Sequence, residues 1–417
     1  MTDFAKICAF VTICCGLFYG VKFSFIGVST LYISVVLIIG IGILQSIKGG
    51  VVNLQSLLLQ MPLILAFLAS LLSVLINYPD SDNFIVFALA AMMILNIFAF
   101  SFFDFFFKNS KESLLFFIII CFVLNAAMVV GMFLFSSFQN LYLSYINEDV
   151  FSVFGGKDEA LESMYRLRMV GFTGFASYAT GFSQVVGLFV LTIHYKLADK
   201  PIDRAYVLFV TLLVASAAIS SRAAIVGVLL WGIFSAIHLG RKFLFTFAAA
   251  SALLVGFFMI ASYLLDSEGL LFFTSWMLDL FVNGLNSASL NETLSMFSVD
   301  ISDVGMLGHS RWYGERGFDY FRQVDVGVFR ILLASGFVGL ACLIMHYCFM
   351  MLGCLVSIDK RSSIVSFVFI MVLALMFLLK GAIIFDFFAF NFVLMALLWA
   401  GWPTVKEEAL DGCVSSS

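Results

Sequence analysis

The sequence predicts an all-α fold, a polytopic membrane helical bundle of about 12 transmembrane helices with two large external loops. Hydrophobic residues make up 63% of the 417 residues and charged residues only 12%. The mean hydropathy is +1.10, far above that of an ordinary soluble domain. Apolar runs also recur from one end of the chain to the other. We therefore expect one integral membrane domain over residues 1–417.

The apolar runs have the length of about 20 residues that crosses roughly 30 Å of hydrocarbon as a helix. The run from Ala205 to Leu239 counts as two spans only if it is cut at Ser220-Ser221-Arg222. The predicted spans are 6–21, 24–46, 54–76, 84–106, 114–137, 171–193, 205–220, 223–239, 243–265, 326–356, 364–384 and 386–401.

The distribution of lysine and arginine predicts the orientation, because short cytoplasmic loops hold positive charge. An even number of spans places both termini on one side, and we expect that side to be the cytoplasm. The short external connections then hold only Lys22, Arg222 and Lys380. The cytoplasmic side receives Lys6, Lys48, Lys108, Lys111, Lys196, Lys200, Arg204, Arg241, Lys242, Lys360, Arg361 and Lys406.

Several classes of function find no support in the sequence. The first apolar stretch lacks a small-x-small cleavage pattern, which favours a retained first span. None of the eight cysteines falls in a predicted external loop, so disulfide and thiolate–metal sites are not expected. Phosphate-loop, dinucleotide, CxxC and HExxH motifs are absent. We expect no cofactor, no metal and no nucleic-acid partner.

Two long loops interrupt the hydrophobic rhythm, at 139–170 and 266–324. Loops of this length are usually functional or disordered. The second contains apolar residues at helical spacing over 270–281, typical of an amphipathic helix on a membrane surface. Ser289 and Glu292 then fit a capping box that opens another short helix. The loop is expected to form either a cap over the bundle or a lid over a site.

Arginines gather near the external ends of two predicted spans, against the positive-inside tendency. Arg166 and Arg168 precede the span at 171–193. A snorkelling anchor or an ion pair with a nearby carboxylate accounts for any single one of these arginines. Before and just inside the span at 326–356 lie Arg311, Arg316, Arg322 and Arg330.

Arg222 has no acidic neighbour in the sequence "AISSRAAIVGVLLW". Ser220 or Ser221 is expected to cap the helix that begins there, whose N-terminus carries about half a positive charge. A guanidinium at that position adds a full charge with the fork geometry that phosphate oxygens favour. If the arginines of both long loops fold over the same place, the pocket suits a pyrophosphate whose hydrophobic tail stays in lipid.

Around Arg222 and at the junction after the second long loop, the sequence resembles the O-antigen polymerase family of bacterial inner-membrane enzymes. Ser221-Arg222 matches a "SR" pair that opens a late-middle helix in that family. Ten residues separate Arg316 from Gly327, as in an arginine-x10-glycine pattern, but neither Arg166 nor Arg168 has such a glycine. The junction "DVGVFRILLASGFVGL" matches D-x-G and G-x-x-G spacings through Asp325, Gly327, Gly336 and Gly339.

The resemblance implies glycosyl transfer at the periplasmic face, for lipopolysaccharide biosynthesis, between oligosaccharide repeat units linked to undecaprenyl pyrophosphate. It also implies that a chain-length regulator protein is a partner, besides membrane lipids. Arg222 is then the first candidate to stabilise the leaving pyrophosphate, and Asp325 and His309 are the candidate bases for the acceptor hydroxyl. The supporting pyrophosphate-binding residues are Arg166, Arg168, Arg311 and Arg316.

Two other functions stay open. An O-antigen ligase, which transfers polysaccharide to lipid A-core, commonly has a histidine near the second-loop junction, whereas His309 lies about sixteen residues before Asp325. A lipid-linked oligosaccharide flippase or transporter should carry charges near mid-membrane. The nearest candidates for such charges, Lys380 and Asp386, fall at the outer ends of their predicted spans.

Overall fold

The computed structural model describes residues 3–48, 54–108, 110–162, 166–240, 294–314, 320–353 and 360–401, with a few isolated residues between 243 and 291. The predicted span 243–265, the predicted amphipathic helix 270–281 and the predicted capping box at Ser289 and Glu292 lie largely or wholly outside these residues. Within the described ranges all the regular elements are helices, which confirms the all-α prediction.

Among the described residues, six helices are long and apolar enough to cross a membrane: α2 (Thr30–Ile47), α5 (Phe84–Phe107), α6 (Lys111–Leu134), α11 (Arg222–Leu239), α15 (Gly327–Gly353) and α16 (Lys360–Leu378), the last over Arg361–Leu378. The transmembrane character of the chain is therefore supported, while the count of 12 spans stays a prediction. The other long helices are α1 (Asp3–Tyr19), α4 (Met61–Ile76), α9 (Tyr178–Leu197), α10 (Arg204–Ser220) and α18 (Phe390–Gly401).

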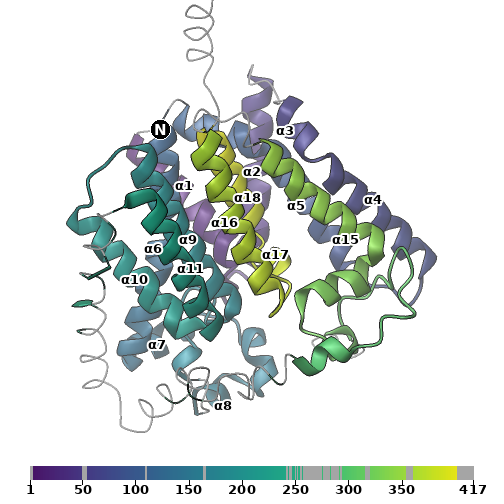
Figure 1. Ribbon diagram of the computed structural model, residues 1–417. Helices are drawn as coiled ribbons and strands as arrows, with labels where there is room; N and C mark the ends of the chain where they lie inside the picture. The colour runs from purple at the N-terminus through teal and green to yellow at the C-terminus, as the bar shows by residue number, and fades with distance from the viewer. Residues whose placement is uncertain are drawn as a thin grey trace, which may run out of the picture.

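Two buried helices form the centre of the bundle (Figure 1). Nearly every residue of α9 and α18 is buried. Helices α6, α10 and α11 pack on α9, whereas α5 and α6 pack on α18. On the far side α4 packs along α15. The core is rich in phenylalanine, and the Phe182 ring lies 5.2 Å from that of Phe390, joining the two central helices.

Short elements gather at one end of the bundle, which we name the loop end. They are α7 (Ser136–Leu143), α8 (Lys157–Glu162) and the 3₁₀ turns at Glu148–Phe154 and Arg166–Arg168, which together occupy most of the predicted first loop. In Figure 1 α7 and α8 lie opposite the N-terminus. The short helix α17 (Ile383–Asp386) precedes α18 at this end.

Local sequence explains several helix starts. Ser29 accepts a hydrogen bond from the Leu31 amide at the start of α2, so this helix begins six residues later than the predicted span. Ser177 and Thr180 form a capping box that opens α9 at Tyr178, seven residues after the predicted start. The stretch before α9 instead folds as a turn with left-handed glycines at 171 and 174.

The predicted cut at Ser220-Ser221-Arg222 is confirmed, since α10 ends at Ser220 and α11 begins at Arg222. The predicted cap is wrong. Ser221 is the N-cap residue but accepts no capping hydrogen bond, and the Ser220 hydroxyl instead donates to the carbonyl of Ser216. Ser220 is buried, and its hydroxyl hydrogen-bonds to the preceding turn of its own helix instead of capping the next one.

Helix α15 contains a break at Gly336, whose φ of +67° lies in the left-handed region. A Cβ at this position would lie 2.3 Å from the amide nitrogen of Gly308, so two glycines let the second loop approach the helix. His309 and Ser310 donate backbone hydrogen bonds to Leu333 and Ala334. The break thus places part of the second loop against the bundle.

Candidate functional site

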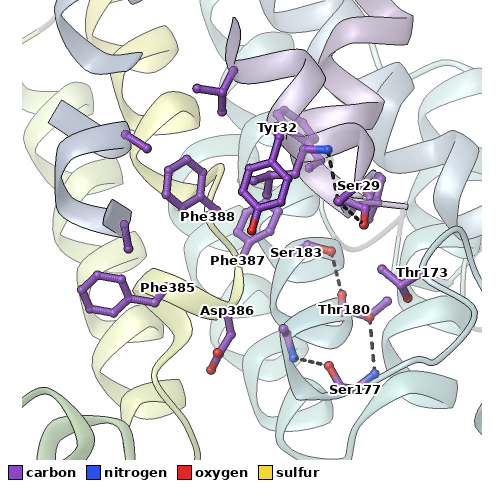
Figure 2. A pocket seen from close by; sticks show the side chains of 18 of the residues that line it. Ser29, Tyr32, Thr173, Ser177, Thr180, Ser183, Phe385, Asp386, Phe387 and Phe388 are labelled. Atoms are coloured by element: carbon purple, nitrogen blue, oxygen red, sulfur yellow. Dashed lines mark hydrogen bonds between the residues drawn. The ribbon is translucent and has the colours of Figure 1, made fainter. Parts of the chain in front are cut away.

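A cavity of about 660 Å³ lies among α2, α5, α9 and α17 at the loop end. We name it the α2/α5 cavity. Figure 2 shows Ser177, Thr180 and Ser183 along α9 on one side and Asp386 across from them. Tyr32, Phe387 and Phe388 lie above these groups. One part of the cavity wall is therefore hydroxyl- and carboxylate-bearing, and the remainder is aromatic and aliphatic.

The apolar side of this cavity reaches the outside of the bundle between α2 and α5. Its lining residues Tyr32, Val36 and Phe87 are 65%, 68% and 70% exposed. Farther along, the same two helices close together: a Cβ on Gly42 would lie 2.6 Å from the Cβ of Phe98. The opening is thus confined to the half of this helix pair near the loop end.

Asp386 belongs to a charged cluster centred on the buried residue Arg330. The Tyr178 hydroxyl donates a short hydrogen bond to Asp386 Oδ2. Arg330 Nη1 lies 3.6 Å from Asp386 Oδ2 and 3.8 Å from Asp325 Oδ1. We name Tyr178, Asp325, Arg330 and Asp386 the Arg330 cluster. It joins the start of α9, the start of α15 and the end of α17.

Arg330 is almost completely enclosed, with a side chain only 3% exposed. Its guanidinium carbon lies 3.6 Å from the ring centroid of Tyr320 and 4.3 Å from that of Trp312. Nε and Nη1 make no hydrogen bond to any of the described residues. Ring faces attract a cation but do not satisfy its N–H donors. A buried guanidinium with two unused donors is costly unless a ligand or ordered water completes it.

Asp82, in the turn before α5, fixes the aromatic residues around Arg330. Its carboxylate accepts hydrogen bonds from the backbone amides of Trp312, at 2.5 Å, and Tyr313, at 3.1 Å. Phe84 stacks on Trp312 with ring centroids 4.9 Å apart and also lines the α2/α5 cavity. Oδ1 of the same carboxylate accepts the Phe84 amide at 3.0 Å. A carboxylate that joins the start of α5 to two loop amides is well suited to hold the loop in one position.

The predicted arginines lie around this site but do not share one pocket. Arg168 donates from Nε to the Ala176 carbonyl and lies 5.1 Å over the ring of Phe175, which lines the α2/α5 cavity. Arg166 is exposed. Arg311 lies 5.2 Å over the ring of Phe321. Arg316 lies outside the described residues.

Arg222 lies beside the same end of α9 as the cavity, but on another face. A Cβ on Gly181 would lie 2.9 Å from the Cβ atoms of Ser221 and Ala224. Gly181 points away from Ala179, Thr180 and Ser183, the α9 residues that line the cavity. Arg222 is therefore separated from the α2/α5 cavity by the first turn of α9.

His309 lies in a second, more exposed group that we name the Arg322 cluster, with Asp303 and Arg322. Arg322 contacts both carboxylate oxygens of Asp303, with Nη1 at 3.0 Å from Oδ1, and also donates to the Asp300 carbonyl. His309 Nε2 lies 3.7 Å from Asp303 Oδ2. The hydrogen bond from Arg322 holds the pKa of the Asp303 carboxyl below its ordinary value. Partial burial, followed by the charge of Arg322, lowers the pKa of His309.

Tyr178, Arg330 and Asp386 are not among the site residues predicted from the sequence. In the sequence alone, a span-end anchor or ion pair accounts for Arg330, and Asp386 is a candidate only for a transport residue. The sequence signal that could identify this site is Arg330 and Asp386, one cation and one anion within or beside apolar segments. Ionisable residues in a membrane cost free energy and usually pair with one another.

No protein-family model, no curated protein and no solved structure matches this chain. Three or more potential metal ligands do not come together anywhere in the described part of the chain.

Proposed function

We propose that the chain is a metal-independent glycosyltransferase of the bacterial inner membrane, with both termini in the cytoplasm, that joins undecaprenyl-pyrophosphate-linked repeat units at the periplasmic face. This is the activity that its resemblance to O-antigen polymerases implies. The observation that carries the proposal is the α2/α5 cavity, which combines the Asp386 carboxylate, paired with a buried guanidinium, with an apolar opening to the outside of the bundle. A substrate with a glycan head and a lipid tail needs both features.

Asp386 has the position of the general base. Its carboxylate lines the cavity, accepts a hydrogen bond from Tyr178 and faces the guanidinium of Arg330. The acceptor hydroxyl oxygen forms the new bond to the anomeric carbon and gives its proton to Asp386. The old bond between that carbon and the pyrophosphate breaks, and the pyrophosphate leaves with the electron pair. Of the two bases predicted from the sequence, Asp325 lies across Arg330 and His309 lies in the Arg322 cluster, and neither is among the residues that line the cavity.

Position decides between the arginines for the leaving pyrophosphate. Arg330 lies between two carboxylates, so most of its charge is already balanced and it is better suited to orient Asp386. Arg168 lies directly behind Phe175 in the cavity wall, and the N-terminus of α9 opens at the capping residue Ser177 beside it. A guanidinium and a helix N-terminus together favour an anion. Arg222 adds its charge from across α9.

The polymerase proposal is tested by deleting the gene and separating the surface polysaccharide on a gel. We expect a single repeat unit on the acceptor and no ladder of longer products. Full-length polymer that remains on its carrier would instead indicate a ligase, and loss of all products would favour a flippase. Complementation with wild type must restore the ladder. Purified protein should extend lipid-linked repeat units in a chelator, and a requirement for magnesium would overturn metal independence.

The arginine assignment is tested by complementation with Arg168→Ala and Arg222→Ala, checked for equal protein levels. We expect Arg168→Ala to reduce polymerisation about 10²-fold, within the range for lost transition-state charge stabilisation, and Arg222→Ala to reduce it less. If Arg222→Ala has the larger effect, Arg222 and not Arg168 stabilises the leaving pyrophosphate. Wild-type polymer from both variants would remove both residues from the site.

A further inference from the structure

A second apolar cavity of about 250 Å³ lies between α15 and α16, which we name the α15/α16 groove. None of the described residues that line it is charged. Its walls include Ile331, Leu343, Tyr347, Met371, Leu375 and Ile384. Ile344 and Leu375 are 58% and 60% exposed, so the groove opens to the outside of the bundle.

One end of this groove reaches the Arg330 cluster. Val328 and Ile331, which line it, flank Arg330 along α15. Ile384 and Phe390 also line it, on either side of Asp386 in sequence. The α2/α5 cavity uses the residues in between, Phe385 to Phe388. The segment 384–390 is thus a wall common to both spaces, and the Asp386 carboxylate lies at this wall.

A cation marks the same end of the groove. Lys380 follows Leu378, a lining residue, by two positions and lies in the turn after α16. A tail held in the groove would bring its phosphate head to this turn, where a lysine favours it as a point charge. The residues that line the groove are therefore apolar, and a lysine follows in the turn beyond its end nearest to Asp386.

We propose that the α15/α16 groove holds the isoprenoid tail of the acceptor while the α2/α5 cavity holds the donor. This inference rests on the proposed function, because polymerisation joins two molecules that are each anchored by a tail. Withdrawing a tail into water would expose its whole apolar surface, so both tails stay in an apolar environment while their glycans react. Two apolar spaces that meet at one carboxylate satisfy that requirement.

The inference is tested by photocrosslinking of full-length protein in phosphatidylethanolamine–phosphatidylglycerol nanodiscs. The probe is a polyprenyl pyrophosphate with a diazirine in its tail, and the labelled peptides are mapped by mass spectrometry. We expect labels in both α2–α5 and α15–α16, and unlabelled undecaprenyl pyrophosphate should reduce both at least tenfold. A diazirine-bearing phosphatidylglycerol serves as the bulk-lipid control.

The outcomes separate this inference from the proposed function. Competed labels in α2–α5 alone, or α15–α16 labels that competition does not reduce, would overturn the acceptor groove and leave the proposed function standing. Absence of competed labels from both places would overturn the two together. Ala374→Trp, which fills the groove, should abolish the α15–α16 label and polymerisation but keep the α2–α5 label. Val372→Trp, at a 40% exposed position of α16 outside the groove lining, is the matched control.

Discussion

The Arg330 and Arg322 clusters each pair an arginine with carboxylates, yet they differ in burial and in hydrogen bonding. Arg322 is partly exposed and contacts both oxygens of Asp303 at hydrogen-bonding distance. Arg330 is 3% exposed, and its carboxylates lie at 3.6 and 3.8 Å. Arg322 uses both oxygens of its carboxylate partner, whereas the buried Arg330 guanidinium retains unused donors beside a cavity. Incomplete satisfaction of a buried charge is the better guide to function.

Loss of charge should have its largest effect at Asp386 and almost none at Asp303. Asp386→Asn keeps the side-chain shape but removes the proposed base, so we expect polymerisation to fall by about 10²- to 10⁴-fold, the usual contribution of a general base. Asp303→Asn is the matched control and should retain near wild-type activity. The measurement is the polymer ladder from purified protein with lipid-linked repeats. Equal activity in Asp386→Asn and wild type would remove Asp386 from the chemistry.

Replacement by lysine should affect Arg330 more than Arg322. Arg330→Lys keeps the charge but loses the planar group that lies over Trp312 and Tyr320. We expect activity to fall by about 10- to 100-fold, equivalent to about 1.4–2.7 kcal/mol, through misplacement of Asp386. Arg322→Lys should change activity less than twofold. To identify a positioning role, the pH profile of Arg330→Lys should shift, which loss of folded protein alone would not produce.

Substitution of Asp82 should have a smaller effect on activity, through the position of the loop that holds Trp312 and Tyr313. Asp82→Asn weakens the hydrogen bonds to the Trp312 and Tyr313 amides, and hydrogen bonds to a charged group contribute about 1.5–3 kcal/mol. We expect a lower midpoint of thermal unfolding and a several-fold loss of activity. Asp80→Asn, two residues earlier in the same turn, is the control. An unchanged midpoint in Asp82→Asn would show that packing of Phe84 on Trp312 holds the loop without the carboxylate.

Local patterns in the sequence predicted the fold better than the site. Hydropathy predicts the helices, and the polar Ser220-Ser221-Arg222 break correctly divides α10 from α11. The spacing that selected Gly336 also has a physical basis, since Gly308 approaches it closely. The Arg330 cluster could not be assembled this way, because Tyr178, Arg330 and Asp386 come from three distant segments. Arg222, the most prominent arginine in the sequence, lies on the other side of α9 from the cavity.

The smallest expected effect concerns His309 in the Arg322 cluster. Because the pKa of His309 is lowered in the folded protein, the unfolded chain binds more protons as the pH falls through about 6.5, the ordinary histidine value. Stability from this group is therefore present above that pH and decreases below it. Wild type should lose slightly more thermal stability than His309→Gln between pH 7.5 and 5.5. If wild type instead loses less thermal stability than His309→Gln, the charge of Asp303 outweighs that of Arg322 at the imidazole. The carboxylate of the Arg322 cluster would then not be fully neutralised by its arginine.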